Sequence, residues 1–390
     1  MIPPGVRAIL DALAFDGRPA DLSHLAPSDL AFADRSQLTL LLSRFPLNDQ
    51  VRPHVESALA RNTERVKKIA DDYAEIRPHF DHVILKGITH IPAFINDPRL
   101  RVQYDLDLYV PQSQAEKTRD ALVTLGYEPI EGMDSLAMDH LPTMVRKTGW
   151  QWRGDFFDPE IPTSIEVHFR FWDPDTERLR AESVDNFWAR RESHQLSLVD
   201  KVGYAALHLT RHLLRGNVRA FHVWELANFL NTHHDPDFWR EWQRLHTASA
   251  RRLESVAFLL AKQWFACRVP DPVEDSIDRL SSSVHRWFEI YGWSPLESMF
   301  APNKDELWLH MSLLDSNFDR FDVLRRRLIP VSPPGHVDAI YTPEDQLTLS
   351  RRVTRAARNW SYAASRAVHH IRLFVPTVWQ GVRWWFHSRS

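Results

Sequence analysis

The sequence predicts an α+β protein in which a small mixed-sheet core is flanked by N-terminal and C-terminal all-helical regions. Two patterns predict this fold: short apolar runs with strict alternation lie between residues 82 and 172, and apolar residues recur at helical spacing on both sides of them. The chain has 390 residues, 44% of them hydrophobic and 25% charged, which is enough for two or three hydrophobic cores. These values exclude a disordered, collagen-like or disulfide-stapled protein.

Residues 1–80 are predicted to form the N-terminal helical region. Apolar residues lie at helical spacing over 6–13 and again near residue 40, and the stretch 51–76 has the pattern of one long helix. Its apolar residues form a single stripe, which predicts packing against the rest of the protein. Nothing in this region indicates chemistry.

Residues 81–195 are predicted to form the α/β core. The apolar run 83–85 predicts a strand that ends at Lys86 and Gly87, and the rhythm of 88–95 predicts a helix after this glycine. The strand expected over 103–110 alternates strictly. Because successive side chains of a strand point to opposite faces, Asp105 and Asp107 must lie side by side.

A helix over 112–125 and a third strand over 163–172 complete the predicted core. This third strand places Ile165 and Val167 on one face, and Glu166 and His168 on the other. Glu166 would therefore supply a third carboxylate on a neighbouring strand.

The remainder of the chain is predicted to contain three parts. A C-terminal helical domain spans 196–327, a Pro-rich loop spans 328–347, and a basic, aromatic helical tail spans 348–390. We expect Pro376 to split the tail into two segments, because proline interrupts helical hydrogen bonding.

The charge is distributed unevenly along the chain. The net charge is -3, but residues 349–390 hold eight arginines and no acidic residue, which leaves -11 on the first 348 residues. The small net charge argues against a protein whose whole surface binds nucleic acid, so no sequence-specific nucleic-acid partner is expected. We expect the basic tail to pack on the acidic body, with an anionic membrane surface or a polyanion as the alternative.

The single cysteine, Cys267, lies in an apolar run and is expected to be a buried small hydrophobe. A chain with one cysteine fits a reducing compartment, and the sequence has neither a signal-peptide pattern nor a membrane-spanning apolar run. We therefore expect a cytoplasmic protein.

The paired aspartates predict a metal site. Two carboxylates one residue apart on a strand repel each other, and a divalent cation relieves this repulsion. Hard oxygen ligands favour Mg²⁺ or Mn²⁺ over zinc, and Glu166 would allow two metals to be held. Lys86 and Gly87 before a helix would bring a positive charge and main-chain N–H groups to a phosphate. These parts together predict phosphoryl or nucleotidyl transfer.

The segments Ile84-Leu85-Lys86-Gly87, Asp105-Leu106-Asp107-Leu108-Tyr109-Val110 and Ile165-Glu166-Val167-His168, with Asp97-Pro98 and Arg101, resemble the uncharacterised bacterial nucleotidyltransferase family of the DNA polymerase β superfamily. The resemblance is clear over residues 82–172. It continues more weakly through 207–212 and 224–227, where Glu225 stands in place of the usual aspartate.

The resemblance implies that Asp105 and Asp107 bind the metals, that Glu166 completes the carboxylate triad, and that Lys86 and Gly87 face the triphosphate. It implies an enzyme that transfers NMP from an NTP, expected to be ATP, to a hydroxyl on a small molecule, sugar, peptide or protein. The alternatives are a non-catalytic nucleotide-binding or antitoxin-like module with the same fold, and a phosphotransferase.

Several nearby residues have two possible roles. Arg101 either balances the triphosphate or pairs with Asp105 or Asp107, and His168 either orients Glu166 and touches substrate or is structural. His208 and His212 have the spacing of zinc ligands, but Leu209 stands where a metalloprotease needs glutamate, so a packing or pocket role is favoured.

Overall fold

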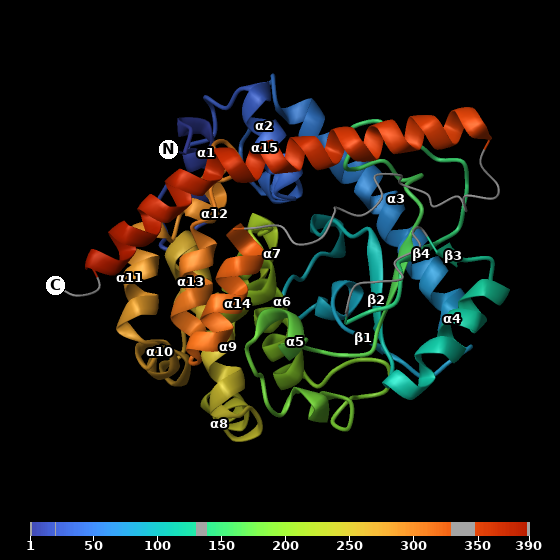
Figure 1. Cartoon of the computed structure of the whole chain (residues 1–390). Helices are drawn as coiled ribbons and strands as arrows, with labels where there is room; N and C mark the ends of the chain where they lie inside the picture. The colour runs from blue at the N-terminus through green and yellow to red at the C-terminus, as the bar shows by residue number, and fades with distance from the viewer. Residues whose placement is uncertain (1, 20, 130–138, 329–347, 388–390) are drawn as a thin grey trace.

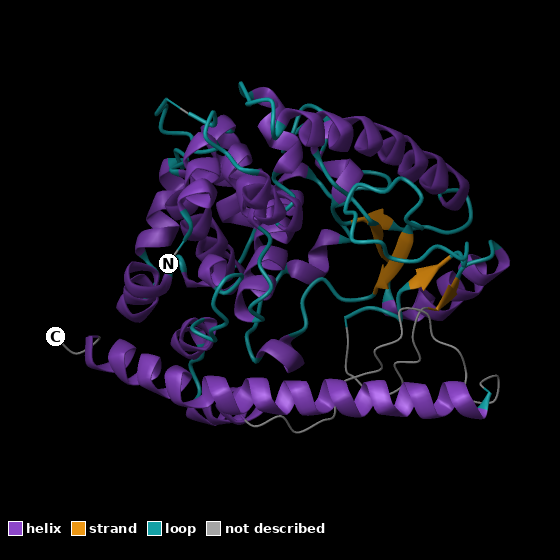
Figure 2. Ribbon diagram, turned by 90° about the horizontal axis from the view of Figure 1, so that it is seen from above, coloured by secondary structure: helices purple, strands orange, loops and turns teal. Residues whose placement is uncertain are grey.

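The computed structural model describes residues 2–19, 21–129, 139–328 and 348–387. It confirms the α+β fold: one small five-stranded mixed sheet lies beside a larger group of helices, and a long C-terminal helix runs along one edge of the molecule (Figures 1 and 2). No helix within the described ranges is long and apolar enough to cross a membrane.

The N-terminal part is helical, and its long helix packs beside the sheet (Figure 1). The elements are α1 (Pro4–Ala12), α2 (Pro27–Arg35), the 3-10 turn η1 (Thr39–Arg44) and α3 (Arg52–Ile76). The long helix α3 carries Arg65, which is fully buried and donates hydrogen bonds to the carbonyls of Gln103 (2.6 Å) and Ile161 (3.0 Å). One buried guanidinium thus connects the chain segments that enter the two central strands.

The sheet has the strand order β1-β2-β5-β4-β3. Its strands are β1 (Val83–Ile84), β2 (Asp105–Tyr109), β3 (Glu128–Pro129), β4 (Met144–Val145) and β5 (Ser164–His168), and between β2 and β3 come η4 (Gln112–Gln114) and α4 (Ala115–Thr124). The central pair β2 and β5 is parallel, and the other pairs are antiparallel. One face of the central pair is buried in an apolar cluster with α4, which leaves the other face for polar side chains.

The predicted helix over 88–95 is wrong. Gly87–His90 forms a single 3-10 turn, η2, after which Ile91 is extended, and a second short turn, η3, spans Pro98–Leu100. Pro92 explains the early stop, because the residue before a proline is disfavoured in the helical conformation and proline itself has no N–H to donate. Gly87 therefore does not lead into an α-helix whose N-terminus could hold a phosphate.

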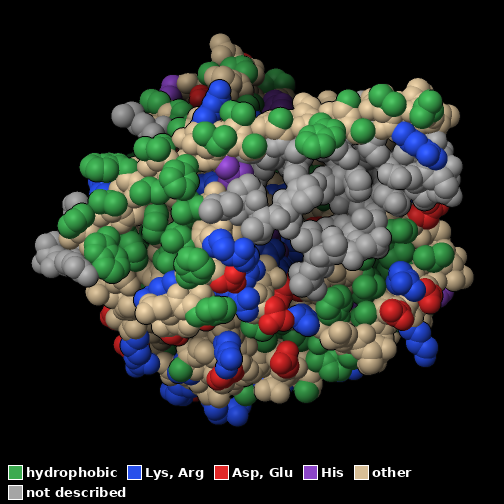
Figure 3. Space-filling model, viewed as in Figure 1, with side chains coloured by type: hydrophobic (Ala, Val, Ile, Leu, Met, Phe, Trp, Pro, Cys, Tyr) green, Lys and Arg blue, Asp and Glu red, His purple; other side chains and the backbone are tan. Residues whose placement is uncertain are grey.

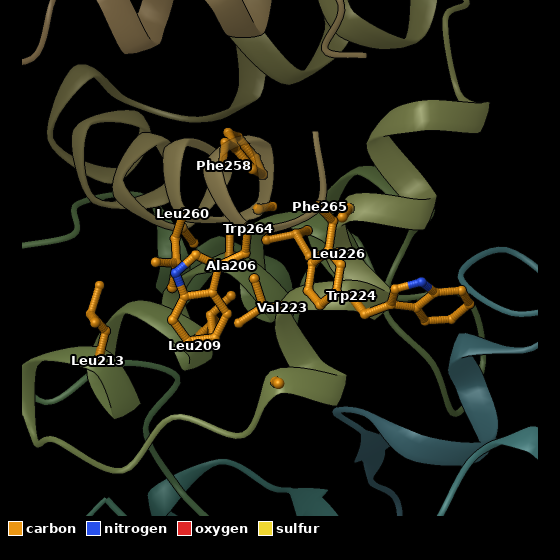
Figure 4. Close-up of a cluster of buried hydrophobic side chains, with 14 of the residues drawn as sticks. Ala206, Leu209, Leu213, Val223, Trp224, Leu226, Phe258, Leu260, Trp264 and Phe265 are labelled. Atoms are coloured by element: carbon orange, nitrogen blue, oxygen red, sulfur yellow. The ribbon is translucent and has the colours of Figure 1, made fainter. Parts of the chain in front are cut away.

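The second half of the chain is helical, as its periodicity predicts. After α5 (Pro174–Glu177) and η5 (Val184–Phe187) come α6 (Leu198–Leu214), α7 (Ala220–Thr232), α8 (Pro236–Leu245), α9 (Ala248–Phe265), α10 (Asp271–Asp278), α11 (Ser282–Tyr291), α12 (Ser294–Glu297), α13 (Glu306–Leu313) and α14 (Asn317–Leu328). Figure 4 shows how apolar side chains of α6, α7 and α9 meet in one cluster. This cluster fixes the positions of α6 and α7, which face the sheet.

The tail forms one helix, α15 (Leu349–His387), so the expected break at Pro376 is wrong. Packing compensates for the lost hydrogen bond: the ring of Trp384 stacks on Trp308 of α13, and the Trp308 indole donates to the Thr377 carbonyl (3.2 Å). Tyr291 of α11 also donates to the Gln380 carbonyl (2.9 Å). Residues 329–347 of the predicted Pro-rich loop, 328–347, lie outside the described residues, and Leu328 is the last residue of α14.

Candidate active site

The carboxylates predicted from the strand alternation meet on the polar face of β2 and β5. Asp107 is directly opposite Glu166 in the parallel register, and Asp105 precedes it on the same face. Asp107 is 2% exposed, whereas Asp105 and Glu166 are partly exposed to a cavity. Buried Leu106, between the two aspartates, points into the core on the other face.

Lys86 lies between the two aspartates. Its Nζ atom is 3.4 Å from Asp105 Oδ2 and 3.2 Å from Asp107 Oδ2. Burial alone would lower the pKa of Lys86, but the carboxylates of Asp105 and Asp107 outweigh burial and raise this pKa above its usual range. The lysine is therefore charged and acts as a counterion inside the site.

Gly87 fills a position that cannot hold a side chain. Its φ angle is +78°, and a Cβ atom added there would lie 2.3 Å from Nε2 of Gln103. The same Gln103 amide donates to the main-chain carbonyl of Asp105 (2.7 Å). The glycine thus allows Lys86, the β1 segment and the start of β2 to approach closely. Its role toward phosphate stays a prediction.

His168 is buried among three carboxylates. Its Nε2 is 3.3 Å from Asp107 and 3.5 Å from Glu166, and its Nδ1 is 3.6 Å from Asp139. Burial would lower the pKa of His168, but Tyr204 and these three carboxylates raise it well above its usual value. His168 is therefore positioned to orient the carboxylates as a cation, whereas its contact with substrate stays a prediction.

Glu166 is held in its ionised form. Burial would raise the pKa of this carboxyl group, but the hydrogen bond with His168 and the charge of Lys86 lower it to about 2. A carboxylate with such a low pKa is a weak proton acceptor near neutral pH and a good ligand for a cation.

Arg101 has a partner that the sequence did not predict. Its Nε donates to Oε1 of Glu225 on α7 (2.8 Å), and Nδ1 of His90 is 3.1 Å from Oε2 of the same carboxylate. Burial would raise the pKa of Glu225, but Arg101 and His90 hold it far below the usual range. Arg101 thus joins the core to the helical half rather than pairing with Asp105 or Asp107.

The opposite wall of the cavity comes from α6, the first turn of α7 and the segment between these helices. This cavity has a volume of about 270 Å³, and its far wall carries a set of basic and imidazole side chains: His208, Arg211, His212, Arg215, Arg219 and His222. Arg211 pairs with Asp139, and Arg215 pairs with Glu177 (2.7 Å). Within the described parts of the chain, no hydrogen bond or ion pair engages the guanidinium of Arg219, which lines the cavity, so its charge is available to a ligand.

The histidines of this wall are neutral. Burial, assisted by nearby cations such as Lys86 and Arg211, lowers the pKa of His212 to about 3 and lowers those of His208 and His222 well below the usual value. Nε2 of His208 lies 3.1 Å from Nε2 of His212, so the two rings hydrogen-bond to each other. This arrangement fits the pocket role that the sequence favoured over zinc binding.

The donor atoms of the site fit a hard divalent cation. One ligand atom each of Asp107, Glu166 and His168 can be chosen so that all three lie within 4.8 Å of one another. Oδ2 of Asp107 is buried and has no hydrogen-bond partner, although Lys86 is near, and Asp105 lies on the other side of this lysine. Mg²⁺ and Mn²⁺ prefer hard oxygen ligands, which the carboxylates of Asp105, Asp107 and Glu166 supply.

A second cavity adjoins the first and shares Asn217 and Arg219 with it. Its volume is also about 270 Å³, and its lining includes Gln37, Tyr104 and Phe156. Gln37 is 3% exposed and adopts a positive φ angle of 63°, and its Oε1 has no hydrogen-bond partner. This cavity therefore combines an unpartnered buried amide oxygen with two aromatic rings.

Sequence reasoning gave no role to Asp139, Arg211 or Arg219, and it did not predict the second cavity. Asp139 lies in a stretch without clear periodicity, and α6 and α7 carry their polar residues within ordinary helical patterns. Only the three-dimensional packing shows that these residues face the strand carboxylates.

Comparison with known protein families places the cavity within one family match. Residues 39–266, more than half of the chain, match the family described as uncharacterised nucleotidyltransferase, and this range includes both walls of the cavity. No curated protein and no solved structure matches the chain. The chain therefore belongs to the uncharacterised nucleotidyltransferase family.

Proposed function

We propose that the chain is a Mg²⁺-dependent nucleotidyltransferase that moves NMP from an NTP to a hydroxyl group of an acceptor. The observation that carries this proposal is the parallel register that sets Asp107 against Glu166, beside Asp105 and opposite a basic wall. Such a cavity has one side suited to a cation and the other suited to a polyphosphate.

Asp105, Asp107 and Glu166 would hold the divalent cation, which would neutralise charge on the phosphate oxygens and acidify the acceptor hydroxyl. The low pKa of Glu166, about 2, favours a role in holding a cation over a role as the proton acceptor. His168 keeps Asp107 and Glu166 in one orientation, and Asp139 and Arg211 in turn hold His168.

In the proposed reaction, the acceptor oxygen forms a bond to the α-phosphorus and the bond from this phosphorus to the bridging oxygen of the β-phosphate breaks. Pyrophosphate leaves with the electron pair of that bond, and the hydroxyl proton is released to water in the cavity. Lys86 and Arg219 would balance the negative charge that collects on the leaving pyrophosphate.

We further propose that the second cavity holds the nucleoside. The first cavity is lined mainly by charged and imidazole groups, as a triphosphate requires, whereas the second offers the rings of Tyr104 and Phe156 and the amide of Gln37. Aromatic rings stack on bases, and amides hydrogen-bond to base edges. Arg219 lies at the junction of both cavities, where the phosphates and the nucleoside would meet.

The test uses the full chain with NTP labelled at the α-phosphate, Mg²⁺, and cell extract as the source of acceptor. Transfer of label to an extract component is expected for the unmodified chain, and Asp105→Asn or Asp107→Asn should lower it by about 100-fold or more. Calorimetry with an α,β-methylene NTP analogue should show binding that needs Mg²⁺. Asp175→Asn, which changes an exposed carboxylate on α5, is the matched control and should leave both measurements unchanged.

Three outcomes would contradict the proposal. Transfer of γ-label instead of α-label would indicate a phosphotransferase. Binding of the analogue without transfer to any component would favour a non-catalytic nucleotide-binding module. Failure to bind the analogue in the presence of Mg²⁺ would exclude both nucleotide-dependent functions.

A further inference from the structure

The helix α15 carries an apolar stripe on its solvent side. In the C-terminal half of this helix, the exposed residues Ile371, Val375, Val378, Val382 and Phe386 recur at intervals of three or four, and exposed Trp379 lies next to them. Residues at this spacing lie on one side of a helix. The stripe therefore consists of large apolar side chains that the body of the protein leaves in contact with solvent.

The same stripe continues through the N-terminal half of the helix. Val353, Trp360 and Val368 are exposed and, at about 100° per residue, fall on the side that Ile371 occupies. With 39 residues, α15 is about 58 Å long. An exposed apolar face of this length is much larger than the scattered apolar residues of an ordinary protein surface.

The opposite side of the C-terminal half is attached to the body. Thr377, Gly381 and Trp384 are buried against α11 and α13, and a Cβ atom at Gly381 would lie 2.2 Å from the Trp308 ring. This attachment fixes which side of the helix faces outward. Figure 2 shows α15 along one edge of the molecule, and Figure 3 shows apolar side chains gathered toward its C-terminal end.

The charge of the helix points to the nature of its partner. Residues 349–387 contain seven arginines and no aspartate or glutamate, whereas the first 348 residues carry -11. At about 100° per residue, Arg372 and Arg383 lie about 75° and 95° from the centre of the stripe on one side, and Arg352 lies about 125° from it on the other side. Tryptophan and phenylalanine on one face with arginine at the flanks is the pattern of a helix that lies in the plane of an anionic membrane surface.

We propose that α15 docks the protein on an anionic lipid surface, with the apolar stripe inserted among the acyl chains and the flanking arginines on the headgroups. The acidic body would be repelled by the same surface, so that only the α15 edge of the molecule makes contact. This surface is independent of the carboxylate cavity and of the reaction proposed for it.

The test is co-sedimentation of the full chain with vesicles of phosphatidylcholine, with and without phosphatidylglycerol. We expect binding to the vesicles that contain phosphatidylglycerol and weaker binding in high salt. The double variant Val375→Ser with Trp379→Ser should bind at least about tenfold more weakly, because both side chains are exposed and their loss removes apolar area from the stripe. Arg372→Glu should weaken binding only to the anionic vesicles.

Phe318→Ser with Phe321→Ser is the matched control, since these side chains are exposed on α14, away from the stripe, and should leave vesicle binding unchanged. Circular dichroism and the melting temperature should be the same for all variants, which separates lost docking from lost folding. Two results would overturn the proposal. One is vesicle binding that is weakened neither by the stripe variant nor by the omission of phosphatidylglycerol. The other is a dimer in sedimentation velocity that the stripe variant dissociates, without any vesicle binding, because it would identify a second copy as the partner.

Discussion

Gly87 is the residue on which the geometry of the carboxylate cavity depends most directly. We expect Gly87→Ala to destabilise the protein by more than about 1 kcal/mol, because the new Cβ meets the Gln103 side chain and the φ angle is +78°. The shift of Gln103 should also move the start of β2 and weaken Mg²⁺-dependent NTP binding. Thermal melting and calorimetry measure the two effects.

Gly126→Ala separates the effect of a strained φ angle from the effect of a crowded Cβ atom. Gly126 has a similar φ angle, +84°, but a Cβ atom there would meet nothing within 4 Å. This variant should lose about 1 kcal/mol of stability and keep full NTP binding. Equal effects of the two substitutions on binding would show that Gly87 does not position the site.

The second cavity makes a separate prediction about single residues. If it holds the nucleoside, Phe156→Ala and Gln37→Ala should each weaken NTP binding by about tenfold, since each removes a stacking ring or a hydrogen bond worth about 1–2 kcal/mol. Neither should change the binding of inorganic triphosphate, which needs only the first cavity. Calorimetry with both ligands checks this. Unchanged NTP affinity in both variants would exclude the nucleoside from this cavity.

Single residues also show where sequence reasoning succeeds. The proximity of Asp105, Asp107 and Glu166 follows from the two-residue period of strands, which acts over a few positions and can be recognised without a structure. Arg219 and Asp139 depend on the packing of distant segments against that sheet. The periodicity of a short stretch of sequence carries no information about such packing. The partner of Arg101 was missed for the same reason, because Glu225 is 124 positions further along the chain.

At the level of secondary-structure elements, a buried charge network joins α6, α8 and α9. His246, which caps α8, is 3.2 Å from Asp200 of α6 and 2.9 Å from Glu254 of α9. A Cβ atom at Gly203 would lie 2.3 Å from the His246 ring, so α6 needs a glycine there. The network thus fixes the spacing of three helices, one of which carries the basic wall of the cavity.

This network predicts a dependence of stability on pH. Burial would lower the pKa of His246, but Glu254 and Asp200 outweigh burial and raise it from 6.5 to about 9. Between pH 6.5 and about 9, His246 is therefore protonated in the folded protein but not in the unfolded chain. Its protonation contributes fully to the free energy of unfolding below pH 6.5, and this contribution is lost as the pH rises to about 9. Its size is about 3 kcal/mol.

His246→Gln should remove this part of the pH dependence. We expect the melting temperature of the unmodified chain to fall more steeply between pH 6.5 and 9 than that of the variant. His24→Gln changes an exposed histidine and serves as the control. Parallel melting curves for the unmodified chain and His246→Gln across this range would contradict the prediction.

Two elements differ from their sequence prediction, and proline is involved in both. Pro92 stops the turn after Gly87, so local backbone sterics overrule the apolar rhythm of 88–95. Pro376, in contrast, lies inside a continuous helix, because contacts of Thr377, Gly381 and Trp384 with the body compensate for the lost hydrogen bond. The same residue type has opposite results, and the difference lies in tertiary packing.

At the scale of the whole molecule, the ion pair of Arg101 and Glu225 connects the sheet side of the cavity to the helical side. Both side chains are about 5% exposed. Glu225→Gln should destabilise the protein by about 3–5 kcal/mol, because it leaves the Arg101 charge buried without its partner. Arg101→Met with Glu225→Met should be less destabilised than Glu225→Gln, since both charges are then removed.

Chemical denaturation of the unmodified chain, Glu225→Gln and the double Met variant measures their free energies of unfolding. Arg99→Met with Asp97→Met removes an exposed ion pair in the same segment and should change the stability by less than about 1 kcal/mol. If Glu225→Gln were as stable as the unmodified chain, the pair would not hold the two halves of the cavity together.

The position of Lys86 has a consequence for the order in which ligands arrive. Its ammonium group already lies within 3.4 Å of both aspartates, so the carboxylates are compensated before any substrate is present. A free divalent cation would have to compete with this group, whereas a nucleotide offers Lys86 phosphate oxygens as a new partner. Nucleotide and metal should therefore bind with positive cooperativity. By thermodynamic reciprocity, each should raise the affinity of the other by the same factor.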